Sequence, residues 1–200
     1  MKEQIIRYLK EKYHPVSLLV LGSYADGTYN ETSDFDAIVI VDIKHADRDL
    51  GEYEGVPLDV DIYTVDEVMF GHPENFVKAH DAEIIIDTEI GKLLKERVIR
   101  YFEETRVTSE NDKRNAKDWI RKTIIRIQRG DDDANFRMAL LMWESLVQYF
   151  LLRDLNFYGS KKSIRYLEDE DEKGYELFHE AVTKKDVESL TKWAEYVKNC

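Results

Sequence analysis

Three short apolar runs, all within the first 65 residues, constrain the fold of this chain most. They are VSLLVLG at 16–22, DFDAIVIVD at 34–42 and LDVDIYTV at 58–65. Runs of this length, bounded by Gly, Pro, Asn and Asp, are typical of strands. From about residue 65 onward the apolar residues recur at helical spacing instead. We therefore expect an α+β fold in which a small mixed β-sheet with flanking helices is followed by an all-helical bundle.

The segment ETRVTSEND at 104–112 is polar and carries no apolar periodicity. Such a change of composition between two periodic regions is typical of a domain boundary. We expect one domain at residues 1–106, with three strands, and a helical domain at residues 107–200. The helical domain should contain a long helix from about 134 to 155 and shorter helices near 162–182 and 186–198.

The formal net charge of −12 narrows the partners that we expect. Proteins that grip a nucleic-acid backbone normally carry a basic face, so nucleic acid is disfavoured, whereas cationic small molecules or metal ions suit this charge. The richest apolar stretch, 138–152, contains Glu144, Ser145 and Gln148 and is too short and too polar to span a membrane. It predicts a buried helix.

The cysteine content and the N-terminus point to one compartment. The single cysteine, Cys200, has no partner for an internal disulfide. The N-terminal MKEQIIRYLKEKY is amphipathic and has no apolar core of a signal peptide. Together they predict a cytoplasmic protein.

Asp34 and Asp36 open the second apolar run, and residues two apart on a strand point to the same face. Two neighbouring carboxylates repel each other unless a cation lies between them, and Mg²⁺ prefers oxygen ligands of this kind. Asp59 and Asp61 share a face of the third run, so either could complete the group. Three aspartates can hold two ions roughly 3.5–4 Å apart, an arrangement that serves phosphoryl or nucleotidyl transfer.

Gly22 and Ser23 end the first apolar run. Glycine lets backbone N–H groups approach an anion closely, and a short helix that starts at Ser23, with Ser23 as its N-cap, would point its N-terminus at a phosphate. Ser33, directly before Asp34, could contact phosphate or close a turn, and the sequence leaves both open.

The order of these features resembles the DNA polymerase β-type nucleotidyltransferase superfamily. Gly-Ser after a strand, a gap at 24–33, Asp-x-Asp at the start of an apolar strand and a third aspartate strand make up its pattern. The segment GSYADGTYNETSDFDAIVIV is similar to the corresponding segment of small bacterial members that have a helical C-terminal domain, such as the kanamycin and lincosamide nucleotidyltransferases. Many members have Ala-Arg-Gly where this chain has Ala25-Asp26-Gly27, so no arginine contact is expected from position 26.

The resemblance implies the roles of individual residues. Gly22 and Ser23 would hold the triphosphate, and three carboxylates would hold two Mg²⁺ ions. The metal ligands would be Asp34, Asp36 and Asp59, with Asp61 as the alternative third ligand.

Two residues of the second half are further candidates. Glu144 interrupts an apolar helix and matches the part of a general base that a helical-domain glutamate plays in kanamycin nucleotidyltransferase. The alternative is a glutamate at the helix edge, paired with Arg or Lys. Lys162, which follows Gly159-Ser160, resembles a lysine that often precedes the last helices of such proteins, near phosphate. The alternative is the charged start of a helix.

The expected function is transfer of a nucleoside monophosphate, AMP from ATP, to a hydroxyl of a small molecule with the help of two Mg²⁺ ions. An aminoglycoside-like antibiotic is one acceptor that suits an acidic protein, and it would imply a role in antibiotic resistance. Two alternatives remain open: an antitoxin-type enzyme that modifies a protein, and a nucleotide-binding module without turnover. Neither a membrane nor nucleic acid is an expected partner, and a homodimer is compatible with the sequence.

Overall fold

The computed structural model describes residues 1–86 and 88–199. The chain divides into two compact units, the first from Met1 to Glu103 and the second from Glu104 onward. The sequence placed the division after residue 106. Cys200, on which part of the compartment prediction rested, lies outside the described residues.

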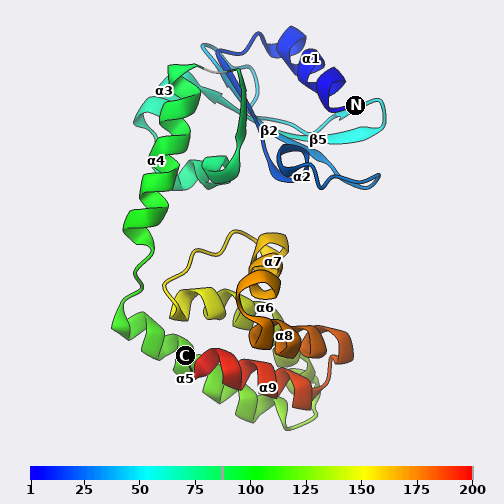
Figure 1. Ribbon diagram of the computed structural model, residues 1–200, viewed down its shortest axis with the longest axis vertical. Coiled ribbons are helices and arrows are strands. Elements are labelled where there is room, and N and C mark those ends of the chain that lie inside the picture. The colour runs from blue at the N-terminus through cyan, green and yellow to red at the C-terminus, as the bar shows by residue number, and fades with distance from the viewer. Residues whose placement is uncertain (87, 200) are drawn as a thin grey trace. The chain divides into compact units, whose positions relative to one another are not determined.

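In the described part of the chain, the first unit is a mixed sheet of six strands with flanking helices, shown in Figure 1, and the α+β prediction is confirmed. Its elements are α1 (Lys2–Tyr13), β1 (Ser17–Val20), α2 (Gly22–Asp26), β2 (Phe35–Val41), β3 (Arg48–Asp49), β4 (Glu52–Tyr53), β5 (Val56–Thr64), α3 (Val65–Phe70), the 3₁₀ segment η1 (Pro73–Asp81), β6 (Glu83–Ile86) and α4 (Glu89–Thr105).

The sheet runs in the order β3-β5-β2-β1-β6, with β4 paired to β5 beside this path. β2 and β5 are parallel, and Asp36 lies opposite Asp59 in their register. The other pairs are antiparallel. A parallel pair cannot be joined by a tight turn, so the connection from β2 to β5 is long, and it contains β3 and β4.

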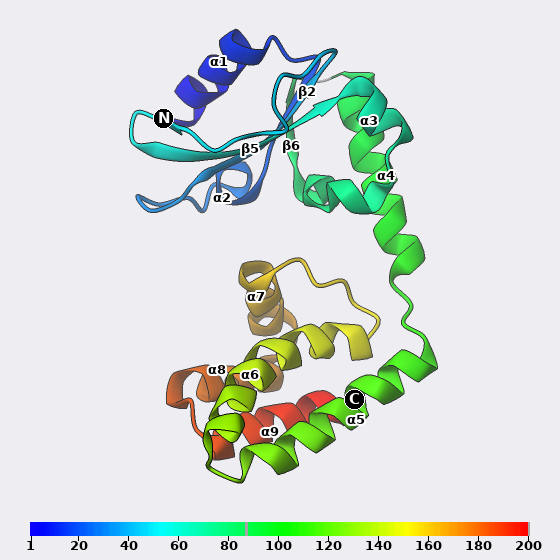
Figure 2. The same cartoon turned by 180° about the vertical axis from the view of Figure 1, so that it is seen from behind.

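The two faces of the sheet have separate apolar cores. On one face, Ile5 and Leu9 of α1 pack with the inward residues of β2 and β5, and Tyr24 of α2 joins them. On the other face, α3, η1 and α4 pack over Ile38 and its same-face neighbours, and Figure 2 shows these helices from behind. Because side chains alternate along a strand, the aspartates of β2 and β5 belong to this second face.

The sheet has more strands than the three that the sequence predicted. β3 and β4 have two residues each, which is too short for any periodic pattern. β6 (EIII) contradicts the expectation that only helices follow residue 65: Ile84 pairs with Leu19, and the Ser17 hydroxyl donates to the Ile86 carbonyl. An apolar run of four residues beside a helical pattern does not reveal which structure it adopts.

The second unit is helical in its described residues, as predicted. Its helices are α5 (Glu110–Ile127), α6 (Asp132–Leu152), α7 (Ser160–Glu170), α8 (Glu172–Lys184) and α9 (Val187–Lys198). Trp193 is fully buried in their common core, and its indole N–H donates to the Ser145 hydroxyl at 2.8 Å. This bond satisfies two polar groups that would otherwise be costly to bury.

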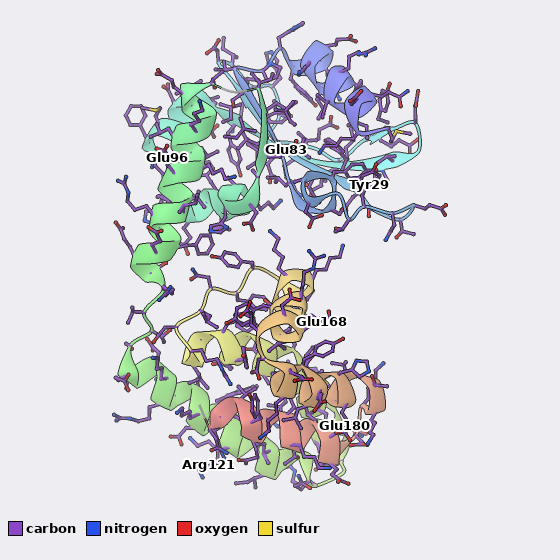
Figure 3. The ribbon with its side chains drawn as sticks, in the orientation of Figure 1. Tyr29, Glu83, Glu96, Arg121, Glu168 and Glu180 are labelled. Atoms are coloured by element: carbon purple, nitrogen blue, oxygen red, sulfur yellow. The ribbon has the colours of Figure 1, made fainter. Side chains whose placement is uncertain are left out.

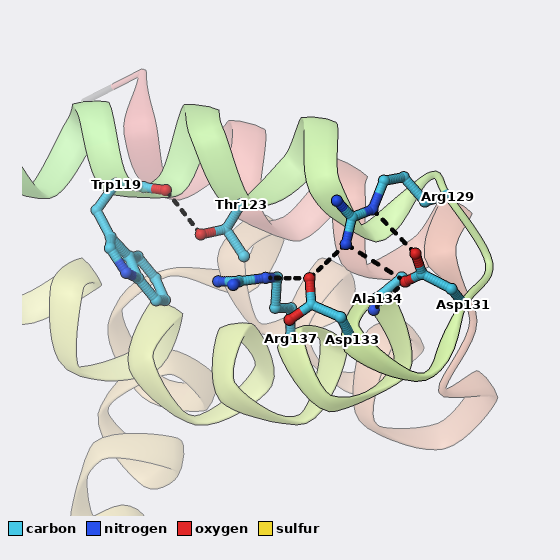
Figure 4. A network of polar contacts seen from close by, with 7 residues as sticks. All are labelled: Trp119, Thr123, Arg129, Asp131, Asp133, Ala134 and Arg137. Atoms are coloured by element: carbon cyan, nitrogen blue, oxygen red, sulfur yellow. Dashed lines mark hydrogen bonds and ion pairs between the residues drawn. The ribbon is translucent and has the colours of Figure 1, made fainter.

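The turn between α5 and α6 is fixed by charged side chains, as Figure 4 shows. Asp131 caps α6 by accepting from the Ala134 amide at 2.8 Å, and Arg129 pairs with both Asp131 and Asp133. Arg137 adds a second cation to Asp133 at 2.9 Å. Acidic residues in the first turn also suit the positive end of the helix dipole.

The prediction that residues 138–152 form a buried helix is right for one side of α6 only. Leu141 and Leu146 lie in the core, but the Trp143 side of the helix faces solvent. Trp143 is 56% exposed, and Phe136, earlier in the helix, is 66% exposed.

None of the helices in residues 1–86 and 88–199 is long and apolar enough to cross a membrane.

Candidate active site

Gly22, at the end of β1, lies directly against Asp36 of β2. The Leu21 amide donates to the Asp36 carbonyl at 2.9 Å, which holds the two segments together. Gly22 has φ +56°, and a Cβ at this position would lie 2.8 Å from Asp36 Oδ2. Both the backbone conformation and the space therefore require glycine. The two motifs that the sequence analysis singled out thus meet at one corner of the sheet.

Ser23 does not take the N-cap position that the sequence suggested. α2 begins at Gly22, Leu21 occupies the N-cap position, and no side chain caps the helix. Ser23 lies half-buried in the first turn of this five-residue helix. The turn at Gly22 therefore positions Ser23, without a cap from its own side chain.

The loop between α2 and β2 is ordered by its own side chains. Asp26 accepts from the amide and the hydroxyl of Thr28 at 3.0 and 2.6 Å. Tyr29, labelled in Figure 3, stacks on Tyr24 with ring centroids 4.3 Å apart. Asp26 therefore shapes the turn that follows α2.

Ser33 closes the last turn of this loop. Its amide donates to the Asn30 carbonyl at 3.0 Å, and its hydroxyl accepts from the Asn30 amide at 3.0 Å. Of the two roles that the sequence left open, the turn has its contacts in the structure, and the contact with phosphate stays a prediction. The turn delivers the chain to Asp34, immediately before β2.

The predicted metal ligands lie on two adjacent strands. Asp34 is exposed before the start of β2, and Asp36 is half-buried inside it. Asp59 is the register partner of Asp36, whereas Asp61 is buried opposite Ile38, two pairs further along. Neighbouring strands lie about 4.8 Å apart, so the register brings Asp59 closer to Asp36 than Asp61.

Two cations that the sequence analysis missed contact Asp59 and Asp61. Arg48 of β3 reaches Asp59 through Nη2 at 2.5 Å and Asp61 through Nε at 3.2 Å. Lys78 of η1 lies 2.8 Å from Asp61 and 3.8 Å from Asp59. No pattern marked either cation, because Arg48 belongs to a two-residue strand and Lys78 to a 3₁₀ segment.

The pKa values of both cations reflect these contacts. The hydrogen bond to Asp59 raises the pKa of Arg48 above its ordinary value. Burial opposes the charge of Lys78, but the hydrogen bond to Asp61 and the charges of both aspartates raise the pKa of its ammonium group. Both cations therefore stay charged at neutral pH.

The residues fit a divalent ion in donor chemistry and in register. Carboxylate oxygens on adjacent strands are suitable ligands for Mg²⁺. Within the described residues, however, no three acidic, His or Cys side chains converge as a ready metal-binding group. The Asp59 carboxylate is engaged by Arg48.

Glu144 and Lys162 belong to the second unit. Glu144 is half-buried on α6, beside the buried Ser145, and within the described residues it makes neither a hydrogen bond nor an ion pair. The expectation of an Arg or Lys partner is therefore not met. Lys162 is exposed in the first turn of α7 and lines a cavity of about 260 Å³ together with Arg106.

Residues 2–108 match the nucleotidyltransferase domain family, and the chain belongs to this family. The match covers the whole sheet with Gly22 and all four aspartates. The protein is accordingly an enzyme that transfers phosphorus-containing groups, and the family supports nucleotidyl transfer in general. Members of this family generally use a nucleoside triphosphate and a divalent metal ion. A comparison with curated proteins finds no match.

Proposed function

We propose that this protein transfers AMP from ATP to a hydroxyl group of a small molecule. The observation that carries the proposal is the corner where Gly22 touches Asp36 and Asp36 lies opposite Asp59. At this corner, a backbone segment that a phosphate can approach lies beside carboxylates on adjacent strands. The chain also belongs to the nucleotidyltransferase family.

Each residue of the corner has a role in the proposal. The backbone of Gly22 and Ser23 would receive the triphosphate, because no Cβ blocks its approach. Asp34, Asp36 and Asp59 would hold two Mg²⁺ ions, which when bound neutralise the charge of the triphosphate. Lys162 would contact the phosphates from the helical unit. Catalysis would come mostly from positioning and charge neutralisation.

The acceptor hydroxyl must lose its proton during the reaction. Its oxygen bonds to the α-phosphorus, the bond from the α-phosphorus to the bridging oxygen breaks, and pyrophosphate leaves with the electron pair. Glu144 is the residue that we assign to take the proton. A half-buried carboxylate with no ion pair in the described residues is suited to a general base.

The experiment is a pyrophosphate-release assay with each of the four ribonucleoside triphosphates and a panel of hydroxyl compounds that includes aminoglycosides. We expect Mg²⁺-dependent release that is fastest with ATP and absent in Asp36→Asn. Asp42→Asn is the matched control, because Asp42 is exposed directly after the other end of β2. Turnover in Asp36→Asn equal to that of the control would refute the proposed site.

The alternative of a nucleotide-binding module without turnover is decided by the same protein sample: binding of metal and ATP in a thermal-shift assay, without pyrophosphate release, would support that module. One observation favours another reading. Exposed Phe136 and Trp143 on α6 favour a protein acceptor, as in an antitoxin-type enzyme. A radiolabelled AMP group found on protein rather than on a small molecule would support that reading.

A further inference from the structure

Arg48, Lys78, Asp59 and Asp61 form a charge-balanced group at the edge of the candidate site. We call these four residues the edge quartet. Two positive and two negative side chains contact one another at 2.5 to 3.8 Å. Arg48 bridges both aspartates, so it restrains the direction of the Asp59 carboxylate. Nearly half of each cationic side chain is exposed to solvent, so both cations can leave at small cost.

The order of the strands in the sheet shows on which side of the candidate site the cations of the edge quartet lie. Gly22 follows β1, Asp36 lies on β2, Asp59 on β5 and Arg48 on β3, and these strands are neighbours in that sequence. Arg48 therefore lies across Asp36 and Asp59 from the Gly22 backbone, and Lys78 lies with it through its contacts to Asp59 and Asp61. If the triphosphate lies at Gly22, as proposed above, Arg48 and Lys78 stand on the opposite side of the metal ligands, where an acceptor would enter.

A cavity of about 260 Å³ opens on that side. It is lined by Arg48 and Lys78, with Asp61, Tyr63 and Asn75 beside them. Of the two aspartates only Asp61 lines the cavity, and Asp59 offsets the second positive charge from behind Arg48. A divalent ion that takes Asp59 removes this negative partner from Arg48, and the two cations of the wall then face the cavity with only Asp61 to balance them.

We propose that Arg48 holds Asp59 until a divalent ion displaces it, and then binds an anionic group of the hydroxyl acceptor in this cavity. In this scheme Asp61 keeps Lys78 in place and is a positioning residue, while Asp59 is the metal ligand. The acceptor class is a hydroxyl compound that carries a phosphate or a carboxylate. The inference rests on the proposed function, and it runs against the cationic acceptor that the overall charge favours.

The first test measures Mn²⁺ binding to the full chain without nucleotide, by electron paramagnetic resonance. An exposed ion pair contributes at most about 1 kcal/mol, which corresponds to about fivefold in binding. We therefore expect Arg48→Gln to bind Mn²⁺ three- to fivefold more tightly than the wild type, and Arg48→Lys to restore the weaker binding in part.

A matched control separates competition from a general change of charge. Lys44 belongs to the same unit and pairs with two other carboxylates, Asp47 and Glu67. Lys44→Gln removes the same charge without touching Asp59. Equal tightening by Lys44→Gln and Arg48→Gln would overturn the competition.

Substitution of the aspartates distinguishes this inference from the proposed function. We expect Asp59→Asn to abolish Mn²⁺ binding and Asp61→Asn to retain it. Loss in Asp59→Asn with no tightening in Arg48→Gln removes the inference and leaves the proposed site standing. Unchanged binding in both Asp36→Asn and Asp59→Asn removes the proposed site itself.

The second test addresses the anion, with glycerol 3-phosphate and glycerol as matched probes titrated into the Mn²⁺-loaded chain. We expect binding of the phosphate ester only, weakened about fivefold in Arg48→Gln, as for loss of one ion pair. A phosphate that bound the metal alone would bind Arg48→Gln as well as it binds the wild type. That result, or equal binding of both probes, would overturn the anionic acceptor.

Discussion

Two of the clusters built around buried or half-buried aspartates, one in each unit, are constructed in opposite ways. In the edge quartet, Asp59 and Asp61 are paired with long cationic side chains that reach in from solvent. In the helical unit, Asp171 accepts from the hydroxyls of Tyr149 and Tyr196, each at 2.7 Å, and from the Gly174 amide at 2.9 Å.

The difference lies in how easily the partners can leave. The donors to Asp171 are neutral groups on helices packed in a core, and the Arg153 guanidinium lies 3.5 Å from the centre of the Tyr149 ring. Arg48 and Lys78 are charged, flexible and exposed, so water or an ion can replace them. A carboxylate held by fixed neutral donors stabilises a fold, whereas one held by mobile cations is available for exchange.

The pKa values agree with this distinction. Burial alone would raise the pKa of Asp171, but the hydrogen bonds from Tyr149, Tyr196 and Gly174 lower it below its ordinary value. Burial and the bond to Asp171 raise the pKa of the Tyr149 phenol. The native state thus favours a charged Asp171 and a neutral Tyr149, which is the pairing that the geometry shows.

The largest expected effect is the loss of nucleotidyl transfer when a predicted metal ligand is replaced. Asp36→Asn and Asp34→Asn should each reduce nucleotidyl transfer by about 10³-fold or more, because a bound metal supplies several kcal/mol of charge stabilisation. The fold should survive, with a melting temperature equal to or slightly above that of the wild type, since a like charge is removed. Steady-state pyrophosphate release and thermal melting check both parts, and a large drop in melting temperature would make these aspartates structural, like Asp171.

Glu144→Gln asks whether the helical unit contributes to chemistry as well as to structure. General base catalysis is typically worth about 10²–10⁴-fold, so turnover should fall by that factor. Triphosphate binding should not change, because glutamine keeps the shape of the side chain. Glu176→Gln, an exposed change on α8, is the control. Normal turnover with an altered melting temperature would return Glu144 to a structural role.

Gly22→Ala tests the corner that supports the metal ligands. A residue other than glycine at φ +56° is strained, and its Cβ would displace the Asp36 carboxylate. A shift of about 1 Å in a catalytic group can cost about 10²-fold in rate, and we expect a loss of that order in kcat/KM. Gly27→Ala is a close match, since Gly27 also has a positive φ (+79°) but has nothing within 4 Å of its Cβ position. Equal losses in the two variants would assign the effect to backbone strain alone.

Asp171→Asn should act on stability and leave nucleotide chemistry intact. The substitution weakens bonds to a charged acceptor and the N-cap of α8, so we expect a loss of about 2 kcal/mol in the free energy of unfolding. Urea unfolding of the full chain, followed by tryptophan fluorescence, measures this loss because Trp193 lies in the same core. A loss of pyrophosphate release without loss of stability would break the distinction between the two clusters.

The smallest expected effect is the pH dependence of the difference in the free energy of unfolding between the wild type and Asp171→Asn. Because the folded pKa of Asp171 lies below its ordinary value of 3.8, its charge stabilises the fold above that value. This contribution is lost as the pH falls below 3.8 and through the folded pKa. The difference between wild type and Asp171→Asn should therefore be full at pH 7 and shrink in this acid range. A difference that stays constant down to pH 3 would show that the charge of Asp171 is not its source.

The sequence predicted what depends on periodicity and on local spacing. The long strands β2 and β5 and the glycine after β1 could be predicted because apolar alternation and the spacing of Gly22, Asp34 and Asp36 are local signals. The helices of the second unit follow from the same kind of pattern. The register that sets Asp36 opposite Asp59 could not be predicted from the sequence, because it depends on which strands pair.

The edge quartet was out of reach of sequence reasoning for a physical reason. Arg48 and Lys78 are 30 residues apart in the chain and meet only because β3 pairs with β5 and η1 packs on the same face. A lone arginine in a polar connection resembles any solvated charge. The exposed side of α6 was missed for the opposite reason, since an apolar run does not reveal which of its residues lack a neighbour.

The strand that carries Arg48 has few backbone bonds to lose. β3 has two residues at the edge of the sheet, and Asp49 fastens it to α1 through Lys12 at 2.8 Å and Tyr13 at 2.6 Å, on the face away from the aspartates. Edge segments of this size open locally at a small fraction of the global free energy of unfolding. Asp49 therefore anchors β3 to α1 independently of its pairing with β5, so the position from which Arg48 reaches Asp59 depends on α1 as well as on the sheet.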